Sequence, residues 1–254
     1  LNALNAGADA YNIAVGYEAG KVITTGAYSV LLGGKAGDAL TTGSHNIAIG
    51  YNALSAEDSH GRNVAIGSAA LQVQDAGANA FNVAIGYDSG QALSTAIRST
   101  LVGGNSGASI TTGQENTFIG YSTGSNTTIG NKNVAIGGEA LSTNVAADCN
   151  VAVGLEALKT MTSATTADTY NTAVGYRAGL SVTSGVENVI VGGLAGDAMT
   201  TGSYNAVLGT SALGANILSN CNVAIGNSAL ATHDLGSASA AYNVAVGFNA
   251  GVAV

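Results

Sequence analysis

A five-residue motif recurs along the whole chain, and its spacing constrains the fold more than any other feature. The motif reads NIAVG, NIAIG, NVAIG, NTAVG or NVAVG in its clearest copies. Of the thirteen intervals between copies, ten are 17 residues long and the others are 19, 21 and 21 residues long. A short fixed period with loop-sized insertions is typical of a solenoid, so we number each coil from the first residue of the motif, position zero. These anchor residues are Asn12, Ser29, Asn46, Asn63, Asn82, Ser99, Asn116, Asn133, Asn150, Asn171, Asn188, Asn205, Asn222 and Asn243.

Positions one to three predict a short β-strand in every coil. Position one is mostly Val, Ile or Thr, position three is Val, Leu or Ile in all fourteen coils, and position four is always glycine, from Gly16 to Gly247. Branched residues in this arrangement are typical of a strand. We therefore predict an all-β fold, a parallel β-solenoid (β-roll or β-helix) of about fourteen coils with a 17-residue period, forming a single repeat domain over residues 1–254.

Position two is also apolar in every coil, so both faces of the predicted strand are apolar. We expect positions one and three to point into the core and position two to point outward. An exposed row of fourteen apolar residues needs a cover, so we predict a homotrimer in which these rows pack together, mostly through alanine. The alternative is a monomer with a shallow alanine face in water, since exposed alanine costs little free energy. The predicted trimer interface consists of Ala14, Leu31, Ala48, Ala65, Ala84, Leu101, Phe118, Ala135, Ala152, Ala173, Ile190, Val207, Ala224 and Ala245.

Position eight divides the coils into two types. It is either glycine or leucine, in the order Gly, Gly, Leu, Leu, Gly, Gly, Gly, Leu, Leu, Gly, Gly, Leu, Leu, Gly along the chain. This order is a super-repeat of four coils with one added coil in the middle block. Each of the three insertions falls in the second leucine-type coil of a block. Tandem duplication explains such an order, whereas a unique active site does not.

Positions zero and four predict the two corners that flank the strand. Asparagine tolerates left-handed backbone and can bond to its own chain, and stacked asparagine side chains can bond to one another from coil to coil. Glycine allows the second corner because it has no Cβ atom. The predicted structural ladder consists of Asn12, Asn46, Asn63, Asn82, Asn116, Asn133, Asn150, Asn171, Asn188, Asn205, Asn222 and Asn243.

Composition excludes two classes of protein. The net charge is −8 and the seven Lys and Arg residues are scattered singly, which excludes a nucleic-acid surface because that needs clustered basic residues. No run approaches the roughly 20 apolar residues of a membrane helix, so we predict no transmembrane segment. Charged residues make up 9% of the chain, so we expect another surface to cover part of it. Because the sequence begins at Leu1, we expect a piece of a longer chain.

The repeat resembles two families of surface-attaching proteins. The stretches NVAIGSAAL and NVAIGYDSG resemble the head repeat of trimeric autotransporter adhesins, which are left-handed parallel β-rolls with the consensus NSVAIG. The 17-residue repeat more closely resembles the NTAVGYxAG…TTG…N repeats of bacteriophage tail fibres, and residues 171–187, NTAVGYRAGLSVTSGVE, are a near-complete copy. The resemblance covers residues 12–251. The adhesin repeat is shorter, so that similarity is confined to the motif.

This resemblance implies a trimeric, left-handed and surface-attaching protein. We therefore expect a structural and receptor-binding segment of a phage tail fibre or similar virion appendage, located in the virion, whose partner is a glycan or protein of the host cell surface. The alternative is the head of a bacterial trimeric adhesin at the bacterial cell surface. Two further hypotheses are a polysaccharide depolymerase and an ice-binding solenoid.

We predict no catalytic residue, no metal ligand and no cofactor. Glu139 and Glu156 share position six in neighbouring coils, so their carboxylates lie about 5 Å apart, the separation found in retaining glycosidases. The same position holds charged and polar residues in other coils, so we expect a solvated surface column instead. No zinc site is expected at His45, His60 or His233, which occupy different coil positions and have no acidic or cysteine companion at metal spacing.

Cys149 and Cys221 both directly precede an anchor and lie four coils apart. That separation is about 19 Å along the stack, which is too far for a disulfide. We expect two free thiols that act as small buried apolar residues.

Tyrosine and threonine form regular columns. All ten tyrosines stand either at position five or directly before an anchor. An exposed row could stack on glycan rings, whereas the alternative is packing over neighbouring corner glycines. Thr-Thr pairs at residues 24–25, 41–42, 111–112 and 200–201 align, but Asp58, Asp75, Val145 and Asp234 interrupt their column, which argues against an ice-binding lattice. The candidate glycan-stacking residues are Tyr17, Tyr51, Tyr87, Tyr121 and Tyr176.

Overall fold

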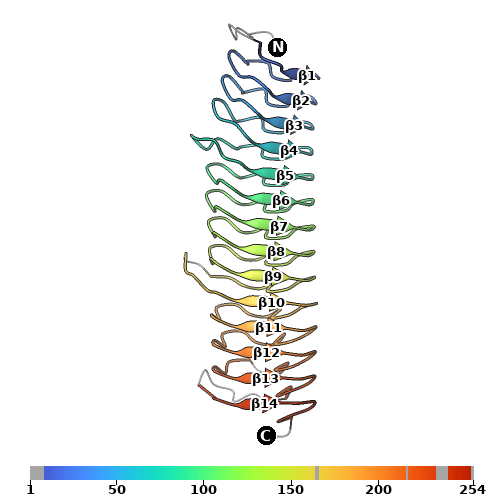
Figure 1. The fold of residues 1–254 in the computed structure, drawn as a ribbon, viewed down its shortest axis with the longest axis vertical. Coiled ribbons are helices and arrows are strands. Elements are labelled where there is room, and N and C mark those ends of the chain that lie inside the picture. Colours follow the sequence, from blue (N-terminus) through green and yellow to red (C-terminus); the bar gives the residue numbers. More distant parts are fainter. Residues whose placement is uncertain (1–8, 164–165, 216, 233–239, 253–254) are drawn as a thin grey trace. The chain divides into compact units, whose positions relative to one another are not determined.

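Fourteen short strands, one in each coil, make up the regular structure. The computed structural model describes residues 9–163, 166–215, 217–232 and 240–252, among which there is no helix. Each strand has three residues and occupies positions one to three of its coil, which confirms the predicted all-β class and period (Figure 1). The strands are β1 (Ile13–Val15), β2 (Val30–Leu32), β3 (Ile47–Ile49), β4 (Val64–Ile66), β5 (Val83–Ile85), β6 (Thr100–Val102), β7 (Thr117–Ile119), β8 (Val134–Ile136), β9 (Val151–Val153), β10 (Thr172–Val174), β11 (Val189–Val191), β12 (Ala206–Leu208), β13 (Val223–Ile225) and β14 (Val244–Val246).

The chain divides into two compact units, residues 1–129 and 130–254. In the first unit β1 to β7 pair in parallel in chain order, and in the second β8 to β14 do the same. Equivalent positions face each other, as Ala48 faces Ala65 between β3 and β4. Each unit is therefore a parallel β-solenoid in which one repeat forms one coil, and Figure 1 shows its strands stacked with the loops on either side.

The middle residue of each strand points into the coil, so the predicted orientation is wrong. Positions one and three are half-buried or exposed instead, as in β12 and β14, where both flanking residues are exposed. This interior position takes alanine in nine coils and a larger apolar residue in five, while the residues of positions one and three take the outer face. The residues predicted to form a trimer interface lie in the core of their own chain; all are buried except Ala14, which is half-buried: Ala14, Leu31, Ala48, Ala65, Ala84, Leu101, Phe118, Ala135, Ala152, Ala173, Ile190, Val207, Ala224 and Ala245.

The two types of coil fill this core differently. In the glycine-type coil of Ser29, a Cβ atom on Gly37 would lie 2.7 Å from Leu40 Cδ1 and 2.9 Å from Leu31 Cδ2, so these side chains already occupy the space. In the leucine-type coil of Asn46, the buried Leu54 takes position eight and Ala48 leaves room for it. Where leucine at position eight fills the core, position eleven no longer needs a large apolar side chain.

The backbone turns through left-handed conformations at three places in each coil. Residues directly before the anchor and at positions six and eight have φ near +50 to +60°, as at Tyr28 (58°), Lys35 (58°) and Leu54 (52°). The anchor asparagines themselves are not left-handed, so the left-handed residue lies one place earlier than predicted. Glycine at position four has a different requirement, because a Cβ atom on Gly33 would lie 2.5 Å from the carbonyl oxygen of Gly50 in the next coil.

The anchor side chains form a hydrogen-bonded column inside each unit. The side-chain oxygen of Asn188 accepts the backbone N–H of Asn205 at 3.0 Å, and that of Asn205 accepts the N–H of Asn222 at 3.0 Å. The side-chain amide of Asn188 donates to the carbonyl oxygen of Gly202, fourteen residues on in the same coil, at 2.9 Å. Asparagine at position zero thus ties neighbouring coils together and closes its own coil.

Candidate functional site

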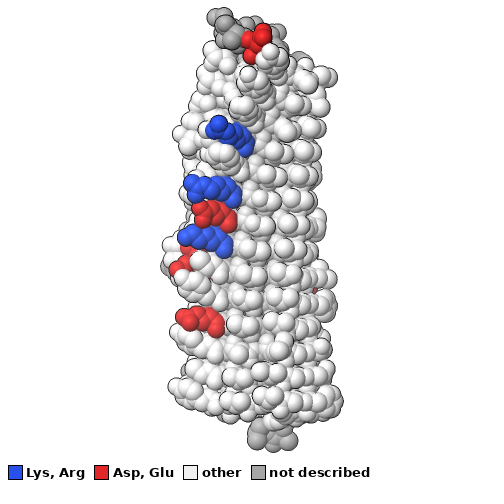
Figure 2. All heavy atoms as spheres, in the orientation of Figure 1, with Lys and Arg blue, Asp and Glu red and all other residues white. Residues whose placement is uncertain are grey.

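The outer face of the sheet is an exposed and regular apolar surface in each unit. Its side chains come from positions one and three, and the most exposed include Val15 at 62% and Val246 at 66%. Ile85, Ile119 and Leu208 continue the exposed rows in the intervening coils. In the view of Figure 2 most charged side chains lie along one edge, and most of the remaining surface is uncharged. Exposed apolar faces of several hundred Å² commonly mark interaction sites.

Tyrosine columns flank this face on both sides. The candidate glycan-stacking residues at position five, Tyr17, Tyr51, Tyr87, Tyr121 and Tyr176, are between 47% and 74% exposed. Some also pack over corner glycines, because a Cβ atom on Gly34 would lie 3.4 Å from the Tyr51 ring. On the other side, directly before the anchors, the rings of Tyr11 and Tyr28 stack with their centroids 5.7 Å apart. The position-five tyrosines therefore stay largely exposed even where a ring also packs over a corner glycine.

Position six carries an ion-pair ladder in the second unit. Lys159 Nζ lies 2.5 Å from Glu139 Oε2 and 2.6 Å from Glu156 Oε1, while Arg177 Nε lies 2.6 Å from Glu156 Oε2. Hydrogen bonds from Lys159 and then Arg177 lower the pKa of Glu156. A glycosidase acid needs the opposite shift, so the arrangement favours a surface ladder over a catalytic carboxylate pair.

The threonine column is turned toward its own backbone. Thr41 Oγ1 donates to the carbonyl oxygen of Asp58 at 2.9 Å, and Thr200 Oγ1 donates to that of Ile217 at 3.0 Å. These hydroxyl groups thus link neighbouring coils and are not arranged as a free lattice for ice. Asp234, like His233, lies outside the described residues.

The two cysteines are free and half-buried, not buried as expected. Cys149 Sγ donates to Asp168 Oδ1 at 3.2 Å. Burial, then the hydrogen bond to Asp168, raises the pKa of the Cys149 thiol, so this residue does not have the acidic thiol of a reactive cysteine.

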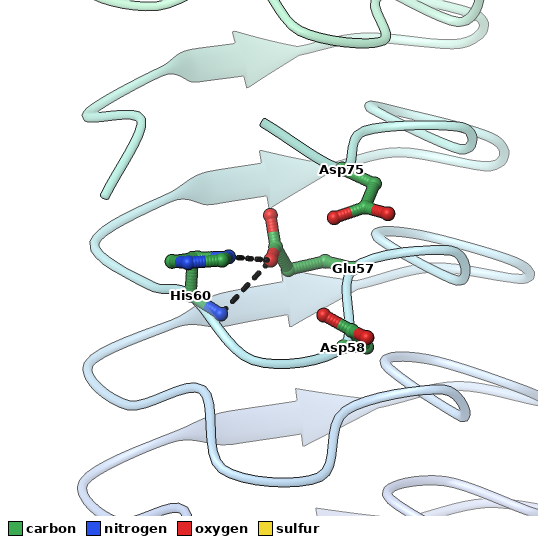
Figure 3. Close-up of side chains that lie close together, drawn as sticks. All are labelled: Glu57, Asp58, His60 and Asp75. Carbon is green, nitrogen blue, oxygen red and sulfur yellow. Dashed lines mark hydrogen bonds and ion pairs between the residues drawn. The ribbon is translucent and has the colours of Figure 1, made fainter. Parts of the chain in front are cut away.

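An acidic cluster lies at one edge of the first unit. One potential ligand atom from each of Glu57, Asp58, His60 and Asp75 lies within 4.8 Å of all the others (Figure 3). Asp58 and Asp75 occupy position twelve in neighbouring coils, whereas Glu57 occupies position eleven. The expectation that no histidine has an acidic neighbour is therefore wrong for His60. Spacing along the chain does not reveal the cluster, because stacking adds Asp75 from the next coil to Glu57 and Asp58, which lie just before His60.

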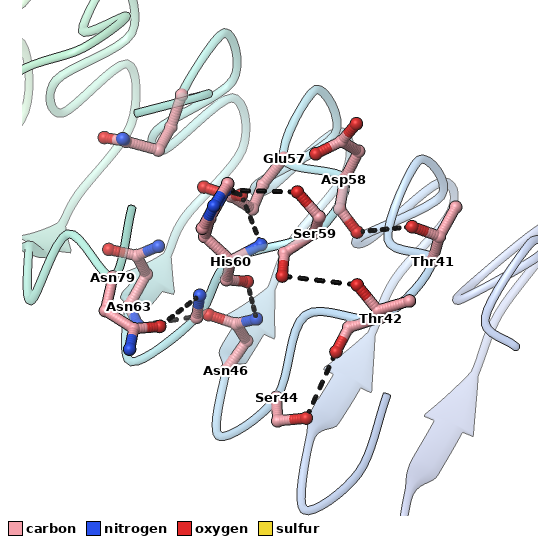
Figure 4. A network of polar contacts seen from close by, with 12 residues as sticks. Thr41, Thr42, Ser44, Asn46, Glu57, Asp58, Ser59, His60, Asn63 and Asn79 are labelled. Carbon is pink, nitrogen blue, oxygen red and sulfur yellow. Dashed lines mark hydrogen bonds and ion pairs between the residues drawn. The ribbon is translucent and has the colours of Figure 1, made fainter. Parts of the chain in front are cut away.

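A polar network holds this part of the backbone in place (Figure 4). The backbone N–H of His60 donates to Glu57 Oε1 at 3.0 Å, and His60 Nδ1 lies 3.2 Å from Ser59 Oγ. The side-chain amide of Asn46 donates to the carbonyl oxygen of His60 at 3.2 Å. Burial raises the pKa of Glu57. The network thus fixes the turn that carries three of the four cluster residues.

Comparison of the chain with protein-family models, curated proteins and solved structures found no match. Among the described residues, the structure contains no helix that is long and apolar enough to span a membrane.

Proposed function

We propose that the chain is a structural and receptor-binding segment of an attachment fibre, of the kind formed by phage tail fibres, and that it acts without enzymatic activity. The observation that carries the proposal is the exposed outer face of the sheet, with Val and Ile at positions one and three and tyrosines beside it. The motif resemblance favours the same function. A virion appendage is the proposed location.

We propose that three copies of the chain associate through this outer face. The first and third strand residues, and not the middle residues, form the contact. Within each unit six intervals of about 4.8 Å give a face roughly 29 Å long, which is long enough for close packing against a second copy. Branched side chains in parallel rows suit such packing because they present a regular and stiff surface.

Light scattering on the purified chain tests the association. One chain has a mass of 24.7 kDa, and the expected mass is three times this value. Ile85→Glu combined with Ile119→Glu places charges on the face and is expected to give single chains that keep the β-rich circular dichroism spectrum. Thr112→Glu is the matched control, since Thr112 is exposed in the same unit but lies off the strands, and it is expected to leave the mass unchanged. A wild-type protein that is monomeric at high concentration would contradict the association.

Glycan-array binding and adsorption to candidate host cells test the receptor-binding role. Tyr87→Ser with Tyr121→Ser removes two exposed rings and is expected to weaken glycan binding at least tenfold, given about 1–2 kcal/mol for each aromatic contact. The corresponding Tyr→Phe pair keeps the ring and is expected to retain most of the binding. Equal binding by the serine and phenylalanine variants would contradict a stacking role for these tyrosines.

A further inference from the structure

The acidic cluster sits where two neighbouring coils depart from the repeat. At position eleven the preceding coil has the buried Leu40, whereas Glu57 takes this place in the coil of Asn46. At position twelve the preceding coils have threonine, whereas Asp58 and Asp75 occupy the place in two successive coils. Parallel stacking in register places these two aspartates one above the other, and the turn at His60 closes the side of the cluster.

The negative charge of the cluster is not balanced by the protein. Three carboxylates share a space in which the ligand atoms lie within 4.8 Å of one another. His60 Nδ1 lies 3.6 Å from Glu57 Oε1 and is charged only when protonated. None of the ion pairs formed by described Lys and Arg residues involves Glu57, Asp58 or Asp75. Like charges at this separation repel one another, and a bound cation would relieve this repulsion.

Glu57 supplies a second and separate observation. Its side chain is fully buried at the base of the cluster, and its Oε2 atom has no hydrogen-bond partner in the described structure. Figure 3 shows Oε1 directed at His60 and the other oxygen directed away from it, on the side of Asp75. A buried carboxylate oxygen without a partner destabilises the folded state or takes up a proton, unless it binds a metal ion.

Two other leucine-type coils show how a polar residue at position eleven is accommodated without a cation. Gln74 occupies position eleven in the next coil, donates to the carbonyl oxygen of Ser94 at 3.3 Å and accepts from the Asn82 amide at 2.8 Å. Asn144, in the second unit, likewise bonds to the backbone of Ala147 through both ends of its amide. These neutral side chains satisfy their polar atoms inside the protein, whereas Glu57 leaves one carboxyl oxygen unsatisfied.

We propose that Glu57, Asp58 and Asp75 bind one hard divalent cation of the size of Ca²⁺, with His60 at the edge of the site. Carboxylate oxygens are the preferred ligands of such ions, and Ca²⁺ lies about 2.3–2.6 Å from its ligands. Atoms up to 4.8 Å apart can therefore all reach one Ca²⁺ ion. The exposed Asp58 and Asp75 leave the outer side open to solvent, so water can complete the coordination and the ion can enter.

A bound cation would fasten two coils together at an insertion. The coil of Asn63 is two residues longer than the standard repeat. There the side-chain nitrogen Nδ2 of Asn63 is buried without a hydrogen-bond partner, although Oδ1 accepts the backbone N–H of Asn82 at 3.1 Å. A cation held by Glu57 and Asp58 of one coil and Asp75 of the next would replace part of that missing connection.

Calorimetric titration of the full chain with CaCl2, MnCl2, MgCl2 and ZnCl2 after chelator treatment tests the site. Saturable binding of one Ca²⁺ or Mn²⁺ ion per chain is expected, with weaker binding of Mg²⁺, which demands shorter and more regular coordination. Glu57→Gln and Asp75→Asn are each expected to weaken binding at least tenfold. Asp38→Asn is the matched control, a partly buried aspartate in the preceding coil outside the cluster, and is expected to bind like the wild type.

Thermal unfolding provides a readout that does not depend on heat of binding. The midpoint of the wild type should rise with Ca²⁺ concentration, because a ligand that binds only the folded state stabilises it. Glu57→Gln should show no such rise, yet in chelator it should be at least as stable as the wild type because it removes a buried charge. Asp75→Asn changes an exposed residue, so it can test the site even if Glu57→Gln fails to fold. Absence of saturable binding by any of the four ions, or unchanged binding in Asp75→Asn, would overturn the proposal.

Discussion

The glycine-type coil of residues 29–45 and the leucine-type coil of residues 46–62 fill the same cross-section from different positions. The first uses Leu31 and Leu40 and keeps Gly37 because no space remains for a side chain. The second uses Leu54, which adopts a left-handed φ of 52° that leucine normally avoids. The two coils therefore fill a similar cross-section with leucine side chains from different positions.

The difference between the coil types also decides where polar groups can enter the core. In most described glycine-type coils position eleven is a large buried apolar residue such as Ile23 or Leu93, whereas in the coil of Asn116 it is the buried Thr127 and Phe118 supplies the apolar volume. In the four leucine-type coils whose position eleven is described, that position is buried and carries Glu57, Gln74, Asn144 or the apolar Met161. Leucine at position eight thus frees a buried place for polar chemistry, and the proposed cation site occupies such a place.

The largest expected effect comes from removing the leucine that defines its coil type. Leu54→Ala leaves a cavity in a core that has no large residue at position two, and is expected to lower the free energy of unfolding by about 2–5 kcal/mol. Hydrogen exchange measured by mass spectrometry should show faster exchange in the coil of Asn46 and its neighbours. The increase in exchange rate should become smaller with distance from the coil of Asn46 along the first unit, because each coil contacts only its neighbours.

The exposed Leu155 provides the matched control for that cavity. It stands at position five of a leucine-type coil and is 51% exposed, so Leu155→Ala should change stability by less than about 0.5 kcal/mol. If Leu54→Ala were as mild as Leu155→Ala, leucine at position eight would not carry the core and the comparison of coil types would fail.

A smaller effect is expected from adding a leucine to a glycine-type coil. Gly37→Leu forces a side chain into space held by Leu31 and Leu40 and should destabilise the protein by about 1–3 kcal/mol. Adding Leu31→Ala and Leu40→Met reproduces the combination of Ala152, Leu158 and Met161 in the coil of Asn150. The triple variant should recover most of the loss in chemical denaturation. A triple variant less stable than Gly37→Leu alone would show that the coil types are not interchangeable.

The sequence predicted the repeat, the strands and the parallel solenoid because these follow from periodicity, which is visible in one dimension. It did not predict which face of the strand is internal. Both faces are apolar, so alternation alone could not separate Ala48 from its neighbours Ile47 and Ile49. In this coil the buried Leu54, six residues further along the chain, fills the interior, so the interior strand position is the small Ala48.

The acidic cluster was missed for a related reason. In the sequence Asp58 and Asp75 interrupt the threonine column, and only stacking places them beside each other. Glu57 has two acidic neighbours only after Asp75 is brought from the next coil. A comparison of side chains at equal coil positions, extended to adjacent positions eleven and twelve, would have found the cluster. The unsatisfied oxygen of Glu57 could not have been found in this way, because it depends on the turn at His60.

The smallest expected effect concerns the ion-pair ladder on the leucine-type coil of Asn150. Hydrogen bonds from Lys159 and Arg177 lower the pKa of Glu156 in the folded protein, so its contribution to stability is present above the ordinary glutamate pKa of about 4.3 and is lost as the pH falls through the lower folded value. Glu156→Gln should therefore lower the unfolding midpoint by a few degrees at most near pH 7, with the difference from wild type disappearing in acid and shrinking in high salt. Glu187→Gln, which changes an exposed glutamate outside the ladder, should show neither dependence. A wild-type advantage over Glu156→Gln that persists unchanged below pH 4 would mean that packing of the side chain, and not its charge, stabilises this coil.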